Sequence, residues 1–290
     1  MPSINQKKIL FTIDVEDWFQ VENLRPWFPP SGWDKCPLRV AQNTHRILDL
    51  FDRFSPKKIK ATFFVLGWVA EKVPELVREI NRRGHEVASH GFGHKMCNQL
   101  DNAALERDLR RSRNLLEQTI GTEVAGYRAP NFSISDQVLK AIQSAGYHYD
   151  SSYNSFSGHG RYGHINVKGA ETNGIAINLA GAFKELPVSN LKLGRRVIPW
   201  GGGGYFRFFP FAVFKAGVQR ILRRNDAYLF YLHPWEIDPD QPRVGGVNRF
   251  SAWRHYVNLD KTDERLVRLI KGFKDCDFIT CSQYLKELPQ

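Results

Sequence analysis

The sequence lacks any long apolar run. No stretch approaches the ~18 consecutive apolar residues that a membrane-spanning helix needs, so we expect no integral membrane segment. The chain begins MPSINQKKILFTIDVEDW, a few lysines and a short apolar run that soon turns acidic. This pattern is too short for a secretory signal, and we therefore expect a cytoplasmic protein unless the chain has been trimmed.

Cysteine is scarce, and its spacing matches no zinc-binding pattern. The cysteines are Cys36, Cys97, Cys276 and Cys281, and the last two stand five positions apart. Because thiols in the cytosol are usually reduced, we expect four free cysteines.

Two further absences bear on nucleotides and nucleic acids. The glycine run at 201–204 is not followed by the lysine and Ser/Thr of a phosphate-binding loop. The net charge is +11, but the basic residues are scattered and form no basic helix, so we expect no nucleic-acid partner. Peripheral contact with an anionic membrane surface or an acidic polymer is compatible with this charge.

Short β-type runs alternate with longer helical patterns along the chain. The expected strands are 8–15, 60–67, 85–90, 124–128, 148–152, 184–189, 227–233 and 277–282. The expected helices are 39–54, 69–84, 101–121, 135–146, 210–225 and 261–274. Alternation of this kind indicates βα units. It predicts an α/β fold, a distorted (β/α) barrel with about seven parallel strands.

The ends of the expected strands carry chemically active residues, among them Asp14, His90, Arg128 and His233. In closed α/β barrels the active site lies at the carboxyl ends of the strands, so we expect these side chains to converge. Two segments, 25–37 and 198–210, are rich in aromatic residues with proline or glycine. We interpret both as flexible walls of a cleft.

A metal site is the sharpest local prediction. Asp14, Glu16 and Asp17 stand within four positions, and close carboxylates repel each other unless a positive partner holds them. His90 and His94 are four apart, and two imidazoles with one carboxylate form a divalent metal site that leaves positions open for water. The alternative is that His94 is a solvated loop histidine. We favour one zinc ion, although cobalt, manganese, iron or nickel would also fit.

Four motifs, FTIDVEDW, SHGFGH, YRAPNF and YLHPWE, occur in the order of those of the polysaccharide deacetylases. From about residue 8 to 235 the chain resembles this family, the chitooligosaccharide-deacetylase group of carbohydrate esterases (family 4). The stretch 250–273, with ELPVS and GGGGYFR, further resembles a bacterial branch associated with exopolysaccharide biosynthesis. We expect one deacetylase domain over 1–290, with a branch-specific part at about 236–290. The resemblance implies a distorted barrel, one divalent metal and hydrolysis of acetyl groups on sugars.

The resemblance also implies roles for individual residues. Asp14 matches the catalytic base, Arg128 the arginine that orients the base, and His233 the general acid. His90 and His94 match the two histidine ligands of the metal. The base would take a proton from the attacking water, and the acid would protonate the departing sugar nitrogen.

The first motif departs from the family pattern at Val15, where family members carry a second, metal-binding aspartate. We choose Glu16 as the carboxylate ligand, because alternate residues of an extended strand share a face. Asp17 is the second choice, since it would need a turn at that point. The acid that binds neither metal nor Arg128 should face solvent or a backbone amide.

Candidate substrate contacts flank the expected mouth. Trp18, Tyr205 and Trp235 could stack on sugar rings, or could simply pack the rim of the barrel. Asn131 could bond an acetamido group, or could cap a turn.

These features predict a metal-dependent deacetylase acting on an N-acetylated polysaccharide or its precursor. The alternatives are an amidohydrolase acting on a small amide or ureide, and a non-catalytic glycan-binding module. The second alternative would fit a chain that had lost the base or the histidines, and Asp14, His90, His94 and His233 are all present.

Overall fold

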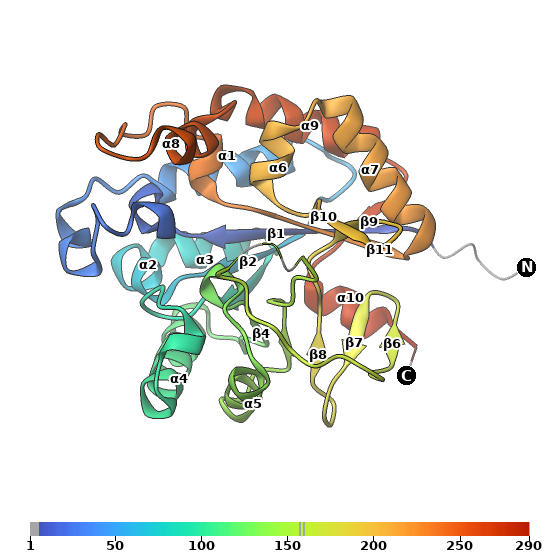
Figure 1. Ribbon diagram of the computed structural model, residues 1–290, viewed down its shortest axis with the longest axis horizontal. Coiled ribbons are helices and arrows are strands. Elements are labelled where there is room, and N and C mark those ends of the chain that lie inside the picture. Colours follow the sequence, from blue (N-terminus) through green and yellow to red (C-terminus); the bar gives the residue numbers. More distant parts are fainter. Residues whose placement is uncertain (1–5, 157, 159, 290) are drawn as a thin grey trace, which may run out of the picture.

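A mostly parallel sheet of ten strands forms the centre of the molecule, and a separate two-stranded hairpin lies beside it (Figure 1). The computed structural model describes residues 6–156, 158 and 160–289. The strands are β1 (Lys8–Val15), β2 (Ala61–Val65), β3 (Glu86–Ser89), β4 (Gly126–Tyr127), β5 (Tyr149–Asp150), β6 (Thr172–Asn173), β7 (Ala176–Asn178), β8 (Lys184–Glu185), β9 (Asn190–Leu193), β10 (Arg196–Pro199), β11 (Ala227–Leu232) and β12 (Asp277–Phe278).

The sheet confirms the expected fold class. Seven strands pair in parallel in the order β11, β1, β2, β3, β4, β5 and β8. β7 and β6 extend the far edge in antiparallel fashion, and β12 pairs in parallel with the start of β1. All eight predicted strands are present, although most are shorter than their sequence patterns.

Helices cover both sides of the sheet. They are α1 (Val40–Asp52), α2 (Gly67–Lys72), α3 (Pro74–Arg82), α4 (Asn102–Ile120), α5 (Asp136–Ser144), α6 (Gly203–Phe208), α7 (Phe211–Arg224), α8 (Arg249–Tyr256), α9 (Thr262–Gly272) and α10 (Cys281–Glu287). In Figure 1, α1 and α6–α9 lie above β1, while α2–α5 and α10 lie below it. Short 3-10 turns lead into and out of the site, among them η1 (Trp18–Gln20), η3 (Pro30–Lys35), η5 (Pro130–Phe132) and η6 (Pro234–Ile237).

Three sequence predictions are wrong in detail. The helix expected over 69–84 is two helices, because Pro74 has no N–H to continue the first and instead begins the second. The strand expected over 277–282 ends at Phe278, and Thr280 caps α10 with its side chain. The segment 198–210, expected as a flexible wall, forms the end of β10 and all of α6.

Strand β1 carries core residues on one face and the reactive Asp14 on the other. Ile9, Phe11 and Ile13 belong to the large core cluster, whereas Leu10 belongs to a second cluster on the other face of the sheet. Alternation along an extended strand puts Thr12 and Asp14 on the same face as Leu10. The reactive acid therefore faces the side of the sheet where Arg128 lies, stacked on Phe64.

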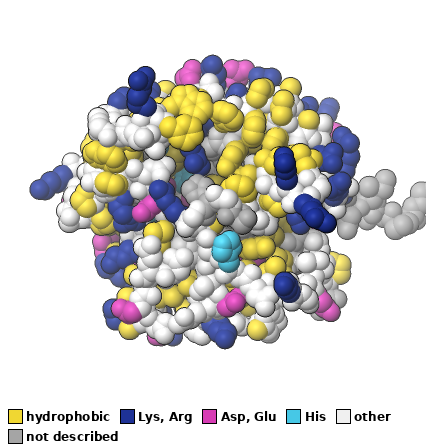
Figure 2. Space-filling view, in the orientation of Figure 1, with side chains coloured by type: hydrophobic (Ala, Val, Ile, Leu, Met, Phe, Trp, Pro, Cys, Tyr) yellow, Lys and Arg dark blue, Asp and Glu magenta, His cyan; other side chains and the backbone are white. Residues whose placement is uncertain are grey.

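Three expected features concern cysteines, membranes and charge. All four cysteines are free, as predicted. Within the described part of the chain, we find no helix with the length and apolar character needed to cross a bilayer. On the face seen in Figure 2, Lys and Arg side chains are dispersed and do not form one continuous patch.

Candidate active site

An open pocket lies where the carboxyl ends of the parallel strands meet. Asp14 stands near the end of β1, His90 directly follows β3, Arg128 directly follows β4, and His233 directly follows β11. The pocket is lined by residues from seven parts of the chain: Asp14, Glu16, 21–23, His90, His94, Ala129, Asn131, Phe132, Arg161, Tyr162, 204–205, Arg207, Tyr231, His233, 235–236 and 254–255. The strand ends thus converge as the sequence suggested.

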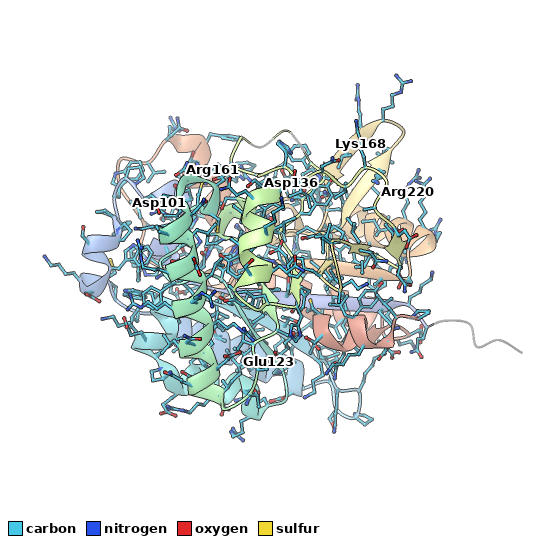
Figure 3. The ribbon with its side chains drawn as sticks, turned by 90° about the horizontal axis from the view of Figure 1, so that it is seen from below. Asp101, Glu123, Asp136, Arg161, Lys168 and Arg220 are labelled. Atoms are coloured by element: carbon cyan, nitrogen blue, oxygen red, sulfur yellow. The ribbon has the colours of Figure 1, made fainter. Side chains whose placement is uncertain are left out.

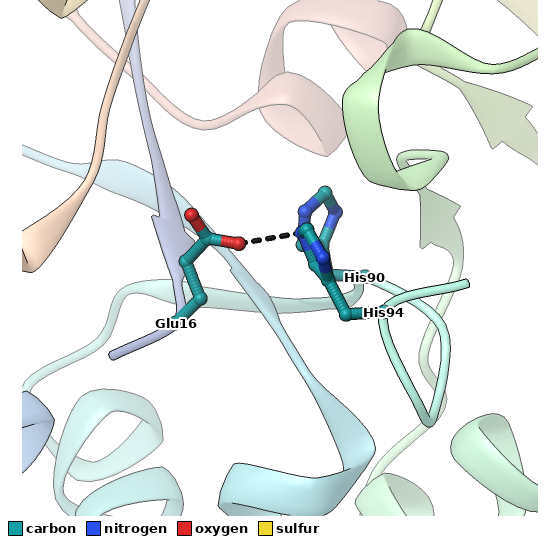
Figure 4. A group of neighbouring side chains, drawn as sticks. All are labelled: Glu16, His90 and His94. Atoms are coloured by element: carbon teal, nitrogen blue, oxygen red, sulfur yellow. Dashed lines mark ion pairs between the residues drawn. The ribbon is translucent and has the colours of Figure 1, made fainter. Parts of the chain in front are cut away.

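Glu16, His90 and His94, which line this pocket, form a compact group (Figure 4). One ligand atom from each residue lies within 4.8 Å of the others, and all three side chains are buried. The carboxylate Oε2 of Glu16 lies 2.6 Å from Nε2 of His94. Two histidines and one carboxylate in this arrangement suit a divalent ion that keeps further positions for water and substrate.

The protein fixes the orientation of His90. Its Nδ1 lies 2.8 Å from the carbonyl oxygen of Arg128, so Nδ1 carries the proton and Nε2 presents a lone pair to the pocket. Burial lowers the pKa of His90 to about 4, which keeps the ring neutral. A neutral ring with one nitrogen tethered to a carbonyl is the form that binds metals.

His94 is held by an unusual backbone conformation. Its φ is 52°, in the left-handed region, and Arg25 donates a hydrogen bond to its carbonyl oxygen over 2.6 Å. Among the described residues, its Nδ1 is buried and has no hydrogen-bond partner. Strained backbone of this kind persists where the surroundings over-determine it, commonly at ligand sites.

Glu16 completes the group from the side of β1. Its Oε1 accepts a hydrogen bond from the indole N–H of Trp235 over 3.2 Å. Burial alone would raise the pKa of Glu16, but His94, His233 and His90 outweigh that effect and hold it well below its usual range. An ionised carboxylate that faces two imidazoles is a suitable ligand set for a divalent cation. The chemistry of Glu16, His90 and His94 is therefore compatible with a metal site.

Asp14 sits beside this group, paired with a fully buried arginine. Nη1 of Arg128 donates to Asp14 Oδ1 over 2.7 Å and to Thr12 Oγ1 over 2.7 Å. The same guanidinium also donates to the carbonyl and the hydroxyl of Ser151. Because Arg128 is held from several sides, it fixes the direction of Asp14 Oδ1 and leaves Oδ2 toward His233.

His233 stands beside Asp14 and Glu16 in the pocket. Its Nε2 lies 3.8 Å from Asp14 Oδ2 and 3.6 Å from Glu16 Oε1. Its Nδ1 lies 2.9 Å from Oε1 of Glu236, three residues along the chain. Burial opposes the charged form of His233, but Glu16, Glu236 and Asp14 raise its pKa to about 9. The ring therefore carries a proton in the metal-free structure.

Glu236 is in turn tied to Arg207 of α6. The ion pair spans 2.8 Å, and each of the two side chains is 2% exposed. Arg207 also donates to the carbonyl oxygens of His255 and Val257. A Cβ atom on Gly203 would lie within 3.0 Å of the Glu236 carboxylate, so only glycine leaves room for it at that position.

Asp17 faces away from the metal group. Its Oδ2 accepts hydrogen bonds from the backbone N–H groups of Arg39 and Val40, which open α1, over 2.7 and 2.9 Å. Its Oδ1 accepts from the N–H of Trp18 over 2.8 Å. This carboxylate caps two helical segments, and it has the backbone-amide partners expected for the third acid.

The candidate substrate contacts divide into two groups. Asn131 and Tyr205 line the pocket, and Asn131 Nδ2 is buried with no hydrogen-bond partner among the described residues. Trp235 also lines it, but its ring is 7% exposed and packs on His255 at a centroid distance of 4.5 Å. Trp18 is outside the pocket lining: it is 2% exposed and packs on Phe28, so we do not retain it as a substrate contact.

Sequence reasoning missed several pocket residues, among them Glu236, Arg207, Arg161 and Arg254. Glu236 had a local signal, since an acid three residues after His233 can reach back to the start of a helical turn. The arginines had none, because their neighbours in space come from distant parts of the chain.

Comparison with known proteins agrees with the class of fold and site described above. Residues 31–149 match the polysaccharide deacetylase family, and residues 151–286 match a domain of unknown function (DUF3473). The first match confirms the resemblance to the polysaccharide deacetylases that the sequence motifs indicated.

Curated relatives match over part of their length. A peptidoglycan-N-acetylglucosamine deacetylase of Bacillus cereus is 31% identical over 104 residues, which cover 36% of this chain and 47% of the relative. A chitooligosaccharide deacetylase of Rhizobium leguminosarum bv. trifolii is 35% identical over 68 residues, covering 23% and 32% respectively. The chain therefore spans less than half the length of these two relatives.

Solved structures share the fold. A candidate polysaccharide deacetylase from Mycobacterium smegmatis superposes with a TM-score of 0.61 at 22% identity, covering 99% of this chain and 92% of that one. A family 4 carbohydrate-esterase pseudoenzyme from Bacillus anthracis superposes with a TM-score of 0.55 at 15% identity, covering 97% and 66%. At these identities the likeness establishes the fold alone.

Proposed function

We propose that this protein is a metal-dependent hydrolase that removes acetyl groups from N-acetylated sugars of a polysaccharide or its precursor. One observation carries the proposal: the group of Glu16, His90 and His94 shares a pocket with the Asp14–Arg128 pair and with His233. The names of the curated relatives, both deacetylases of N-acetylated glycans, support the same reaction.

We assign the metal to Glu16, His90 and His94, with Asp17 as a helix cap. A divalent ion there would supply Lewis-acid polarisation of water and of the acetyl carbonyl. Zinc is our first choice because imidazole and carboxylate ligands suit it, although cobalt, manganese, iron and nickel also accept such ligands.

Asp14 acts as the general base in this proposal. Arg128 holds one carboxylate oxygen, so the other, Oδ2, is directed toward the pocket and can take a proton from the attacking water. His233 acts as the general acid: Glu236 holds its Nδ1, and its Nε2 can deliver a proton to the departing sugar nitrogen. Asn131 Nδ2, buried and without a partner among the described residues, is placed to bind the acetamido group.

We further propose one catalytic domain over residues 1–290, in an exopolysaccharide-associated branch of the family. Residues from both matched regions line the same pocket, His90 and His94 from the first and His233 from the second. The part at about 236–290 supplies α8, which carries two lining residues, Arg254 and His255.

Acetate release tests the reaction. The wild-type protein, loaded with zinc, should release acetate from N-acetylglucosamine oligomers and not from ureides, and removal of the metal by a chelator should abolish the release. Asp14→Asn should lower the rate by about 10²–10⁴ while metal content stays unchanged. A matched control, Glu171→Gln at an exposed position, should change neither.

Three outcomes would contradict the proposal. Equal acetate release by Asp14→Asn would show that Asp14 is not the base. Release from ureides alone would indicate an amidohydrolase, and metal and glycan binding without any release would indicate a binding module.

A further inference from the structure

The pocket holds more positive charge than its own acids can pair. Four carboxylates line it, and each already has a basic or imidazole partner within 3 Å. These pairs are Asp14 with Arg128 (2.7 Å), Glu16 with His94 (2.6 Å), Glu22 with Arg25 (2.6 Å) and Glu236 with Arg207 (2.8 Å). No acid that lines the pocket is left over for a further guanidinium.

Two arginines of the lining remain unpaired. Arg161 lies in the segment after β5, and Arg254 lies in α8. Neither guanidinium forms an ion pair or hydrogen bond with any other residue in the described part of the chain, whereas Arg128, Arg207 and Arg25 all do. A divalent ion at Glu16, His90 and His94 would add to this excess of positive charge.

Both arginines stand at the edge of the molecule that holds the reaction centre. Figure 3 places Arg161 near Asp101 and Asp136, at the amino-terminal ends of α4 and α5, and far from Glu123 at the opposite edge. In βα units that edge is the one where the strands end. A hydrogen bond from the N–H of Asn166 to Asp136 Oδ1 fastens the segment of Arg161 to α5.

We propose that Arg161 and Arg254 bind an anionic group, a carboxylate or a phosphate, on the N-acetylated glycan. The inference rests on the proposed function, since it names the substrate class of the same pocket. A guanidinium offers a planar fork of N–H donors that matches both carboxylate and phosphate oxygens. An acidic glycan or a glycosyl phosphate should therefore bind more tightly than a neutral N-acetylglucosamine oligomer of the same length.

Equilibrium binding tests this proposal independently of turnover. In the Asp14→Asn background, dissociation constants are measured for two pairs of probes. The first pair is an N-acetylglucosamine oligomer and an oligomer of the same length that alternates N-acetylglucosamine and glucuronate. The second pair is N-acetylglucosamine and N-acetylglucosamine 1-phosphate. The acidic member of at least one pair should bind about tenfold or more tightly, as charge-assisted hydrogen bonds allow.

Substitution of the arginines should remove this preference. Arg161→Gln and Arg254→Gln should each reduce the ratio of neutral to acidic dissociation constants by about threefold, and the double variant should bring it near one. The control Arg220→Gln, at an exposed position in α7 that Figure 3 shows away from Arg161, should leave the ratio unchanged. The probe that shows the larger ratio identifies the anion as carboxylate or phosphate.

Two results separate this inference from the proposed function. Equal binding of neutral and acidic probes, or an unchanged ratio in the double variant, overturns the inference even if the wild type deacetylates sugars. Failure of the wild type to release acetate from any probe overturns the proposed function, while the binding ratios still decide the inference. Vesicles containing phosphatidylglycerol should not compete with the probes; if they do so only when both arginines are present, the anion is a lipid headgroup and the inference fails.

Discussion

The two matched regions of the chain contribute to the pocket in different ways. In residues 31–149, the metal-binding candidates follow a strand at once: His90 comes directly after β3 and His94 four residues later. In residues 151–286, His233 depends on Glu236, which depends on Arg207 from a separate helix. The first region places its ligands by local geometry, and the second by contacts between distant segments.

This difference indicates which parts of the site can change independently. The metal-binding candidates each have one hydrogen bond with a distant residue: His90 with the Arg128 carbonyl, His94 with Arg25 and Glu16 with Trp235. His233 is oriented by Glu236, which is held in turn by a buried ion pair with Arg207. Removal of either partner should therefore change the orientation of His233. The following experiments test that distinction, beginning with the largest expected effect.

Loss of a metal ligand should have the largest effect. Glu16→Ala, His90→Ala or His94→Ala should each lose bound metal, measured by elemental analysis, and with it nearly all acetate release. Asp17→Ala should retain metal but unfold more easily, by about 1–2 kcal/mol, because α1 loses its cap. If Asp17→Ala alone lost the metal, the assignment of Glu16 as ligand would be wrong.

Removing the partner of His233 should reduce turnover and leave the metal in place. Glu236→Gln should lower kcat by about 10²-fold with a much smaller change in KM, since the acid is no longer held in position. Glu264→Gln, at an exposed position of α9, is the matched control and should have wild-type kinetics. Metal loss in Glu236→Gln would mean that the two halves of the pocket are not separable.

The buried ion pair of the second region should affect stability strongly. Arg207→Met leaves Glu236 buried without its partner, and we expect unfolding free energy to fall by about 3–5 kcal/mol in urea denaturation. Arg268→Met, at a half-exposed position of α9, should change it by less than about 0.5 kcal/mol. The double change Arg207→Met with Glu236→Leu should recover part of the loss; no recovery would indicate that the backbone contacts of Arg207 dominate.

A smaller effect is expected on the pH dependence of the unfolding free energy, and it should be similar for one buried histidine in each region. Burial lowers the pKa of His85 in the first region and of His255 in the second, each to about 3. The unfolded chain binds a proton on each ring below pH 6.5 and the folded chain does not, so stability is full above pH 6.5 and falls as the pH drops. Each ring should account for about 2 kcal/mol between pH 7.5 and 5.

Single variants separate the two contributions. His85→Asn and His255→Asn should each reduce the slope of unfolding free energy against pH by a similar amount, measured by urea denaturation at several pH values. His148→Gln, an exposed histidine, should leave the slope unchanged. A slope that survives the substitution of both buried rings would mean that neither stays neutral in the folded protein.

Much of the fold could be predicted from the sequence. Short apolar runs alternate along the chain with segments of helical period, and this pattern predicted eight strands. All eight are present in the structure, because the pattern reflects burial along each element. It missed α6 and α8, where glycine and aromatic residues give no helical period, and it merged α2 with α3 across Pro74. It also missed α10 and the short strands β6, β7, β9 and β10.

The candidate site was partly predictable for a related reason. The motif residues Asp14, His90, Arg128 and His233 stand at strand ends, so their position along the chain already indicated one edge of the sheet. Trp18 seemed equally well placed, yet its ring packs on Phe28 away from the pocket. Which side a residue turns to after a strand ends depends on the packing around it.

The sequence by itself determined the parallel α/β fold and the kinds of side chain at its strand ends, because burial and hydrogen bonding along single elements leave a periodic record in the chain. Only the tertiary structure separated Glu16, which faces two imidazoles, from Asp17, which caps α1. It alone also showed that no acid among the described residues pairs with Arg161 or Arg254, since pairing of charges depends on which distant segments meet in space.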